Sequence, residues 1–142
     1  MPDTHEISDD ESLYRKVPIS PNWYNQESNE LSPDAFNPRR GDETGISLER
    51  AQSTEHPEFR TIEQAAQGPS PKGYYVAVLR VGDLRGAGLN VVADPDVGRG
   101  VPGHVLITDL TYDNRKTPES EEKKILLAHE LVLKVEGPFP LA

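Results

Sequence analysis

Residues 73–81, GYYVAVLRV, place the tightest constraint on what this chain can fold into. Successive side chains of a β-strand point to opposite faces of the sheet, and here both sets are apolar from Tyr74 to Leu79. A strand with one face in water would instead alternate apolar with polar residues. The sequence therefore predicts a central strand covered on both faces, within a sheet that packs against other elements.

Weaker patterns predict the remaining elements. Further strands are expected at residues 13–17, 45–48, 89–93 and 103–110, the last two separated by a Gly- and Pro-rich loop. One helix is expected to begin at residues 49–52 and a second to run over residues 57–67. A short helical turn is expected at residues 83–85, and another helix is expected to start at Thr117 with Pro118. Residues 125–135 fit either a continued helix or a strand from about Glu130, and the alternation of Leu131, Leu133 and Val135 favours the strand. The predicted fold class is α+β: a small mixed, mainly antiparallel sheet of four to six strands with two or three short helices.

Charge is unevenly distributed along the chain. Of 142 residues, 24 are acidic and 15 are Lys or Arg, which gives a net charge of −9. Residues 1–12 hold five acids and no cation, which predicts a flexible acidic tail before a single α+β domain over residues 13–142. That domain carries 15 cations and 19 acids, a net charge of −4, and Arg15, Arg39, Arg40 and Arg50 all lie in its first part. A local anion-binding pocket is therefore compatible with the acidic composition.

Several functional classes are disfavoured by composition. The acid excess argues against broad binding to nucleic acid or to anionic membranes, since both need clustered cations. The chain has no apolar run of about 18 residues and no signal-peptide pattern, so we expect no membrane span and a cytoplasmic location. Without Cys there is no disulfide or thiolate nucleophile, and the four scattered His residues predict no metal site.

Residues 19–45 form a long segment rich in Pro, Asn, Ser and Gly, with isolated large residues such as Trp23 and Phe36. Structureless loops of this length are more often functional than idle. One hypothesis is therefore a non-catalytic interaction protein, antitoxin-like or a defence-accessory subunit. It would use the acidic tail and this loop on a protein partner with a basic surface.

The order of segments supports a second hypothesis. Tyr14-Arg15 on an early strand is followed by the long loop, by GISLERA, by YYVAVLRV with GDLRGAGLNVVADP, and by GHVLITDLT. This order resembles the ADP-ribosyltransferase superfamily, in particular the branch with the bacterial RNA 2′-phosphotransferases, over residues 13–111. The chain also looks like small uncharacterised bacterial proteins. The resemblance implies an ADP-ribosyltransferase-like fold that binds NAD or an ADP-ribose-like group, as in a bacterial toxin or modifying enzyme.

Residue roles follow from the resemblance. Tyr14 and Arg15 match the early pair whose cation contacts the ribose and phosphates of NAD, Ser47 matches the strand serine that supports the ribose, and Arg50 is placed for a second phosphate contact. A catalytic Glu late in the chain would be Glu121 or Glu130. The His of the phosphotransferase branch is replaced by Gly45, so that activity is not implied.

Each of these residues also has a structural explanation. Arg15 could pair with acids of the tail, Ser47 could bond to backbone, and Arg50 could be a solvated helix residue. His104, the histidine best placed for acid–base work, could equally be a hydrogen-bonded structural imidazole. From the sequence, the chain is either an NAD-dependent ADP-ribosyl transferase or a protein without catalytic activity.

Overall fold

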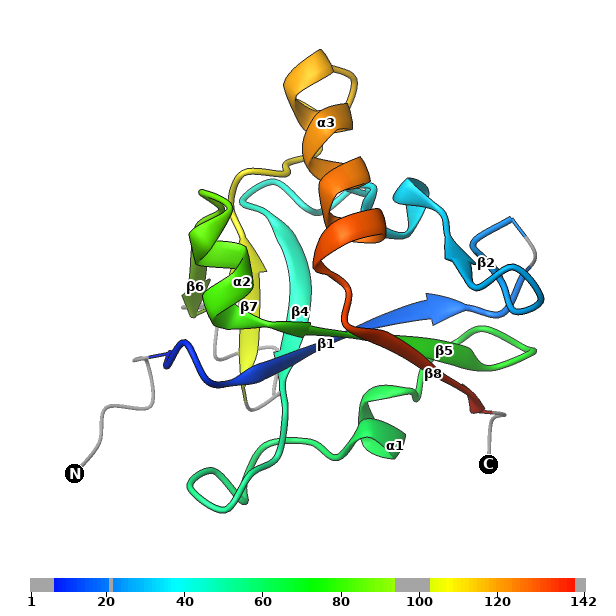
Figure 1. Cartoon of the computed structure of the whole chain (residues 1–142), viewed down its shortest axis with the longest axis vertical. Coiled ribbons are helices and arrows are strands. Elements are labelled where there is room, and N and C mark those ends of the chain that lie inside the picture. Colours follow the sequence, from blue (N-terminus) through cyan, green and yellow to red (C-terminus); the bar gives the residue numbers. More distant parts are fainter. Residues whose placement is uncertain (1–6, 21, 94–102, 140–142) are drawn as a thin grey trace.

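The computed structural model describes residues 7–20, 22–93 and 103–139 (Figure 1). Its main sheet is antiparallel, in the order β6-β7-β4-β1-β5-β8. The strands are β1 (Ser12–Pro18), β4 (Ile46–Arg50), β5 (Tyr74–Arg80), β6 (Val91–Ala93), β7 (His104–Ile107) and β8 (Lys134–Phe139). The remaining elements are the hairpin strands β2 (Tyr24–Asn25) and β3 (Glu30–Leu31), the helices α1 (Ile62–Ala65), α2 (Val81–Gly86) and α3 (Pro118–Leu126), the 3-10 turn η1 (Pro33–Phe36) and the π-helical turn η3 (Leu127–Leu131). The prediction of a small α+β domain with a mainly antiparallel sheet is confirmed.

The apolar segment forms an interior strand, as its pattern predicted. β5 pairs with β1 over seven residues and with β8 on its other side, and residues 74–79 are all buried. Its two faces belong to two separate clusters. Tyr75, Ala77 and Leu79 join the main core, whereas Tyr74 and Val76 pack in a smaller cluster with Ala66. Both faces of the sheet are therefore covered at this strand.

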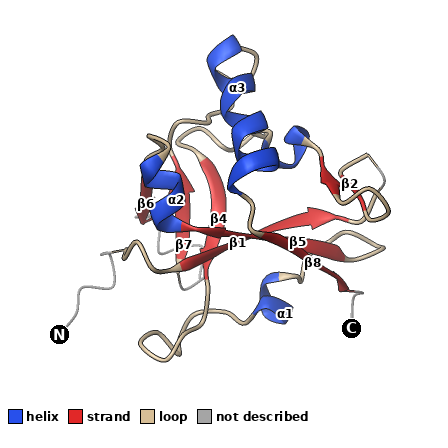
Figure 2. Cartoon of the chain, viewed as in Figure 1, coloured by secondary structure: helices blue, strands red, loops and turns tan. Residues whose placement is uncertain are grey.

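Helices lie on the two sides of the sheet unequally (Figure 2). α2, α3, η1 and η3 cover one side, where Leu13, Val17 and Leu127 help to form the main core; we call this the core side. Among the described residues, the helix on the other side is the short α1, reached by the chain that leads to it, and we call this the open side. Because α1 has only four residues, part of the open side between β1, β4 and β7 remains accessible.

β1 and β4 diverge soon after they meet. Their pairing covers only Leu13 opposite Arg50 and Tyr14 opposite Glu49, and Figure 1 shows β4 running steeply across the direction of β1. The Arg15 side chain bridges the divergence. Its Nε donates to the Ala35 carbonyl at 3.0 Å and its Nη1 to the Ser47 carbonyl at 2.8 Å, so one guanidinium joins β1, η1 and β4.

Three predicted elements differ in the structure. The helix expected at residues 49–52 is the end of strand β4, because Glu49 and Arg50 are held by pairing with β1 and β7. The helix expected over residues 57–67 is only α1, whose start is fixed by the capping box of Thr61 and Gln64. Over residues 125–135 the helix continues through η3 to Leu131, and the strand begins at Lys134.

Residues 7–12 of the predicted acidic tail contact the rest of the domain. Ile7 is buried, Asp9 pairs with Arg85 at 2.7 Å, and Glu11 pairs with the buried Arg50. Within residues 7–12, the acids Asp9 and Glu11 thus meet arginines of the domain. Residues 1–6 and the predicted loop over residues 94–102 lie outside the described residues. Within the described part of the chain, no helix combines the length and apolar character needed to cross a membrane.

Candidate functional site

Two adjoining pockets open around the point where β1 and β4 diverge. The strand pocket, about 280 Å³, is lined by Tyr14, Arg15, Lys16, Ser47, Leu48, Glu49, Arg60 and His104. The loop pocket, about 300 Å³, is lined by Arg15, Lys16, Pro18, Trp23, Ala35, Arg39, Arg40, Asp42, Pro69 and Tyr74. Arg15 and Lys16 belong to both. We call the two pockets together the groove.

Strand alternation brings the polar residues of the groove together. On β4, Ile46 and Leu48 are buried in the core, so Ser47 and Glu49 face the open side. The register places Glu49 directly opposite both Tyr14 of β1 and His104 of β7. Directly opposed side chains of an antiparallel pair have Cβ atoms roughly 4.5–5.5 Å apart. His104, Glu49 and Tyr14 thus form one row across three strands on the floor of the strand pocket.

Cations dominate the walls of the groove. Lys16 donates from Nζ to the Gln67 carbonyl at 2.8 Å and forms no ion pair with a carboxylate of the described residues. Burial lowers its pKa, and the positive charges of Arg60, Arg15 and Arg39 lower it further, against the opposing effect of Glu49. Like charges gathered in this way repel one another, and a bound anion would relieve that repulsion.

Arg15 stays charged in spite of its position. Burial lowers the pKa of its guanidinium to about 10, and nearby Arg39 acts in the same direction while Asp42 opposes it. At neutral pH the group is therefore protonated. Two of its donors are used by the carbonyls of Ala35 and Ser47, and a guanidinium has five N–H donors in all. Arg15 can thus serve as structural support and still present donors to the groove.

Glu49 is the acid within the strand pocket. Its side chain is 17% exposed, and its Oε1 lies 3.1 Å from Nη1 of Arg60. Burial raises its pKa above the ordinary value, although Arg60, Lys16 and His104 act in the opposite direction. Burial also raises the pKa of the Tyr14 phenol, so that group is neutral at physiological pH. The strand pocket therefore combines a partly shielded carboxyl group with neutral and cationic donors.

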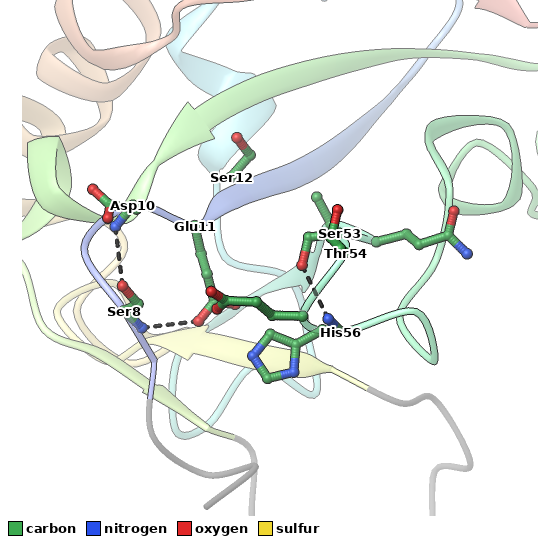
Figure 3. A pocket seen from close by; sticks show the side chains of 10 residues that line it. Ser8, Asp10, Glu11, Ser12, Ser53, Thr54 and His56 are labelled. Carbon is green, nitrogen blue, oxygen red and sulfur yellow. Dashed lines mark hydrogen bonds between the residues drawn. The ribbon is translucent and has the colours of Figure 1, made fainter. Parts of the chain in front are cut away.

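A larger pocket of about 410 Å³ lies at the other end of β1 (Figure 3). Its polar groups are already used in local turns: the Ser8 amide donates to Glu11 at 2.8 Å, the Asp10 amide to Ser8 Oγ at 3.3 Å, and the His56 amide to Ser53 Oγ at 3.1 Å. Among the described residues, no group of three or more His, Asp or Glu is placed to hold a metal ion. We therefore regard the groove as the better candidate site.

The structure brings together four of the residues that the sequence suggested and separates the others. Tyr14, Arg15, Ser47 and His104 all line the strand pocket. Arg50 lines neither part of the groove. It points to the core side, where it is 1% exposed, pairs with Glu11 and lies 4.4 Å from the centre of the Phe59 ring.

The two acids suggested from the late part of the chain also lie outside the groove. Glu121 is on α3, where its Oε1 is 2.6 Å from Lys124 Nζ, and Glu130 is an exposed residue of η3. Both elements cover the core side. Neither acid lines the groove, since both lie on elements that cover the core side of the sheet.

Sequence reasoning missed Lys16, Glu49 and Arg60. The first two were detectable, since they lie two residues after Tyr14 and Ser47 and share a sheet face with them. Arg60 has no such signal, because its position depends on a bridge between Ala51 and Arg60. Comparison of the chain with protein-family models, curated proteins and solved structures gave no match. A function for this chain therefore has to be argued from the groove itself.

Proposed function

We propose that the groove binds a small phosphorylated ligand of the nucleotide class, with ADP-ribose or NAD as representatives. One observation carries the proposal: two adjoining pockets share Arg15 and Lys16, and their other walls add Arg39, Arg40 and Arg60, in a chain whose net charge is −9. These five cations outnumber the two acids of the groove, Glu49 and Asp42, and an anionic ligand would offset the remaining repulsion.

The chemistry of the groove suits such a ligand in three parts. Guanidinium groups bind phosphate oxygens through two parallel hydrogen bonds, so the shared walls at Arg15 and Lys16 are suited to a pyrophosphate. In the loop pocket, Trp23 has the guanidinium of Arg39 5.8 Å from its ring centre and offers an aromatic surface for a base. In the strand pocket, Ser47 and Glu49 offer oxygens to hydroxyl groups.

The proposal concerns binding and does not include ADP-ribosyl transfer. Glu121 and Glu130, the acids suggested for that step, lie outside the groove. The alternative of an acidic docking tail has less support, because Asp9, Asp10 and Glu11 are paired with arginines of the same chain. Their charges are thus partly neutralised before any partner could bind.

The experiment is a titration monitored by Trp23, the single tryptophan of the chain, together with melting temperatures. ADP-ribose and NAD should change the Trp23 fluorescence and raise the melting temperature, because a ligand that binds only the folded state stabilises it. Adenosine, which has no phosphate, should have a much smaller effect. If neither ADP-ribose nor NAD changes either signal at millimolar concentration, the proposal is wrong.

A matched pair of variants locates the site. Lys16→Gln should weaken ADP-ribose binding about tenfold, since a hydrogen bond to a charged group contributes roughly 1.5 kcal/mol or more. Lys72→Gln removes the same charge from an exposed residue that lines neither pocket, and should leave the affinity unchanged. Equal losses in the two variants would show only a long-range charge effect. Arg15 is less suitable for this test because it also supports the fold.

A further inference from the structure

The row of His104, Glu49 and Tyr14 contains side chains that can transfer protons, which ligand binding alone does not require. In strand register, Glu49 of β4 lies directly opposite His104 of β7 and Tyr14 of β1, and the charge of His104 acts on the Glu49 carboxyl group. All three line the same pocket as Arg15, Lys16 and Arg60. A candidate general base, a candidate general acid and cations that can hold an anion thus line one pocket of about 280 Å³.

Each group is suited to one role in a reaction at phosphorus. Glu49 is partly withdrawn from water, which makes its carboxylate a stronger base than an exposed one. His104 can carry a proton to a leaving oxygen. Arg60 has five donors, so it can keep a contact with Glu49 while others reach a phosphate.

We propose that this row cleaves single-stranded RNA by internal transphosphorylation, with Glu49 as general base and His104 as general acid. Glu49 removes the proton of a ribose 2′-hydroxyl, and the 2′-oxygen forms a bond to the adjacent phosphorus. The bond between phosphorus and the 5′-oxygen breaks, and the imidazolium of His104 gives its proton to that oxygen. The products are a 2′,3′-cyclic phosphate and a 5′-hydroxyl, with no other reactant consumed.

Two features favour this reaction over other phosphate chemistry. The substrate supplies its own nucleophile, so the protein needs only the base, the acid and the cations that the pocket contains. The loop pocket continues the groove beyond the shared residues and offers Trp23, on which an unpaired base can stack. The acidic surface elsewhere would keep affinity for RNA low, which is compatible with turnover of short segments.

The test uses the full chain, a short unstructured RNA labelled with a fluorophore and a quencher, and EDTA throughout. The wild type should cleave this RNA and should leave the same sequence in DNA intact, because DNA lacks the 2′-hydroxyl. Mass spectrometry should find the 2′,3′-cyclic phosphate. Absence of cleavage by the folded wild type would overturn the proposal, and so would cleavage of the DNA at a comparable rate.

Variants separate this activity from a contaminating nuclease. Glu49→Gln and His104→Asn should each lower the cleavage rate by about 100-fold or more, as expected for loss of a general base or acid. Glu122→Gln, an equal charge change at an exposed residue of α3 outside the groove, should retain the wild-type rate. A rate unchanged in both groove variants would assign the cleavage to a contaminant and refute the proposal.

This inference rests on the groove but not on the identity of its nucleotide ligand, so the two proposals can fail separately. If ADP-ribose binds and RNA is not cleaved, only the ribonuclease proposal is wrong. If RNA is cleaved and ADP-ribose does not bind, the proposed ligand is wrong. If both hold, ADP-ribose should inhibit cleavage competitively, because the phosphates of both would occupy Arg15 and Lys16.

Discussion

The pair of Glu11 and Arg50 should be the largest single electrostatic contribution to the stability of this domain. Its two contacts are Arg50 Nε to Glu11 Oε1 at 2.6 Å and Nη2 to Oε2 at 2.7 Å, and Oε2 also accepts from the Ser8 amide at 2.8 Å. The Arg50 side chain is 2% exposed and that of Glu11 12% exposed. Glu11→Gln would therefore remove a carboxylate from direct contact with a buried guanidinium charge.

The size of the loss follows from this burial. Removing one partner of a buried ion pair costs about 3–5 kcal/mol. Because Arg50 also lies over the Phe59 ring and Glu11 is not fully buried, we expect the lower end, about 3 kcal/mol. For a domain of this size that corresponds to a fall in melting temperature of about 10 °C. Such a loss would be a large share of the roughly 5–15 kcal/mol that stabilises a typical domain.

The contribution of Glu11 should also depend on pH. Burial alone would raise the pKa of its carboxyl group, but hydrogen bonds from Arg50 and the Ser8 amide, together with the charges of Arg50 and His56, outweigh burial and lower it below 4.5. A group with a lowered folded-state pKa contributes stability that is fully present above its unfolded pKa and is lost as the pH falls through the folded value. The stability difference between wild type and Glu11→Gln should thus be constant above about pH 5.5 and shrink as the pH falls below 4.5.

Urea denaturation at several pH values measures both effects. The control is Asp10→Asn, because Asp10 is 90% exposed at 3.2 Å from Arg80 and an exposed pair contributes only about 0–1 kcal/mol. If Glu11→Gln costs no more than Asp10→Asn, the buried pair does not stabilise the fold as argued. A difference that persists unchanged at pH 3 would show that the loss comes from packing and not from charge.

Two further expectations concern the strand β4 and the groove. Gly45→Ala should destabilise the fold by about 2–4 kcal/mol in urea denaturation, because φ at Gly45 is +146° and a Cβ there would lie 2.6 Å from the Ile107 carbonyl oxygen. Gly86→Ala in α2, where an added Cβ would meet open space, should be neutral or stabilising by up to about 1 kcal/mol. Equal effects of the two substitutions would contradict the packing argument. In the cleavage reaction, kcat/KM should fall as the pH is lowered, with a midpoint above pH 4.5. The reason is that burial raises the pKa of Glu49 against the opposing effects of Arg60, Lys16 and His104. A midpoint at or below pH 4.5 in the pH profile would exclude Glu49 as the base.

Local signals in the sequence were sufficient to predict those elements whose structure depends mainly on their own residues. The apolar pattern of residues 73–81 identified β5, and Thr117 with Pro118 identified the start of α3, where the Thr117 hydroxyl accepts from the Ser120 amide. Glu49 and Arg50 show the opposite case. As a charged pair they suggest a helix start, yet pairing with β1 and β7, both distant in sequence, keeps them in a strand.

The candidate site was predictable to the extent that it follows from alternation along strands. Tyr14 and Ser47 lie in the groove, but the strand register that adds Glu49 and His104 beside them is a tertiary property. Arg50 was expected near the ligand but lies elsewhere. As a strand residue it is on the same face of β4 as Ile46 and Leu48, which is the core side. Arg15 is on the same face of β1 as Leu13 and Val17, and its side chain reaches the groove because β1 and β4 diverge beside it.

The division of β4 between a core side and an open side has a consequence for how this protein can evolve. Ile46 and Leu48 are constrained by packing, whereas Ser47 and Glu49 between them contribute little to the core. Selection on stability and selection on ligand would therefore act on alternate residues of the same strand. The open side can change its chemistry one residue at a time while the neighbouring positions keep the domain folded.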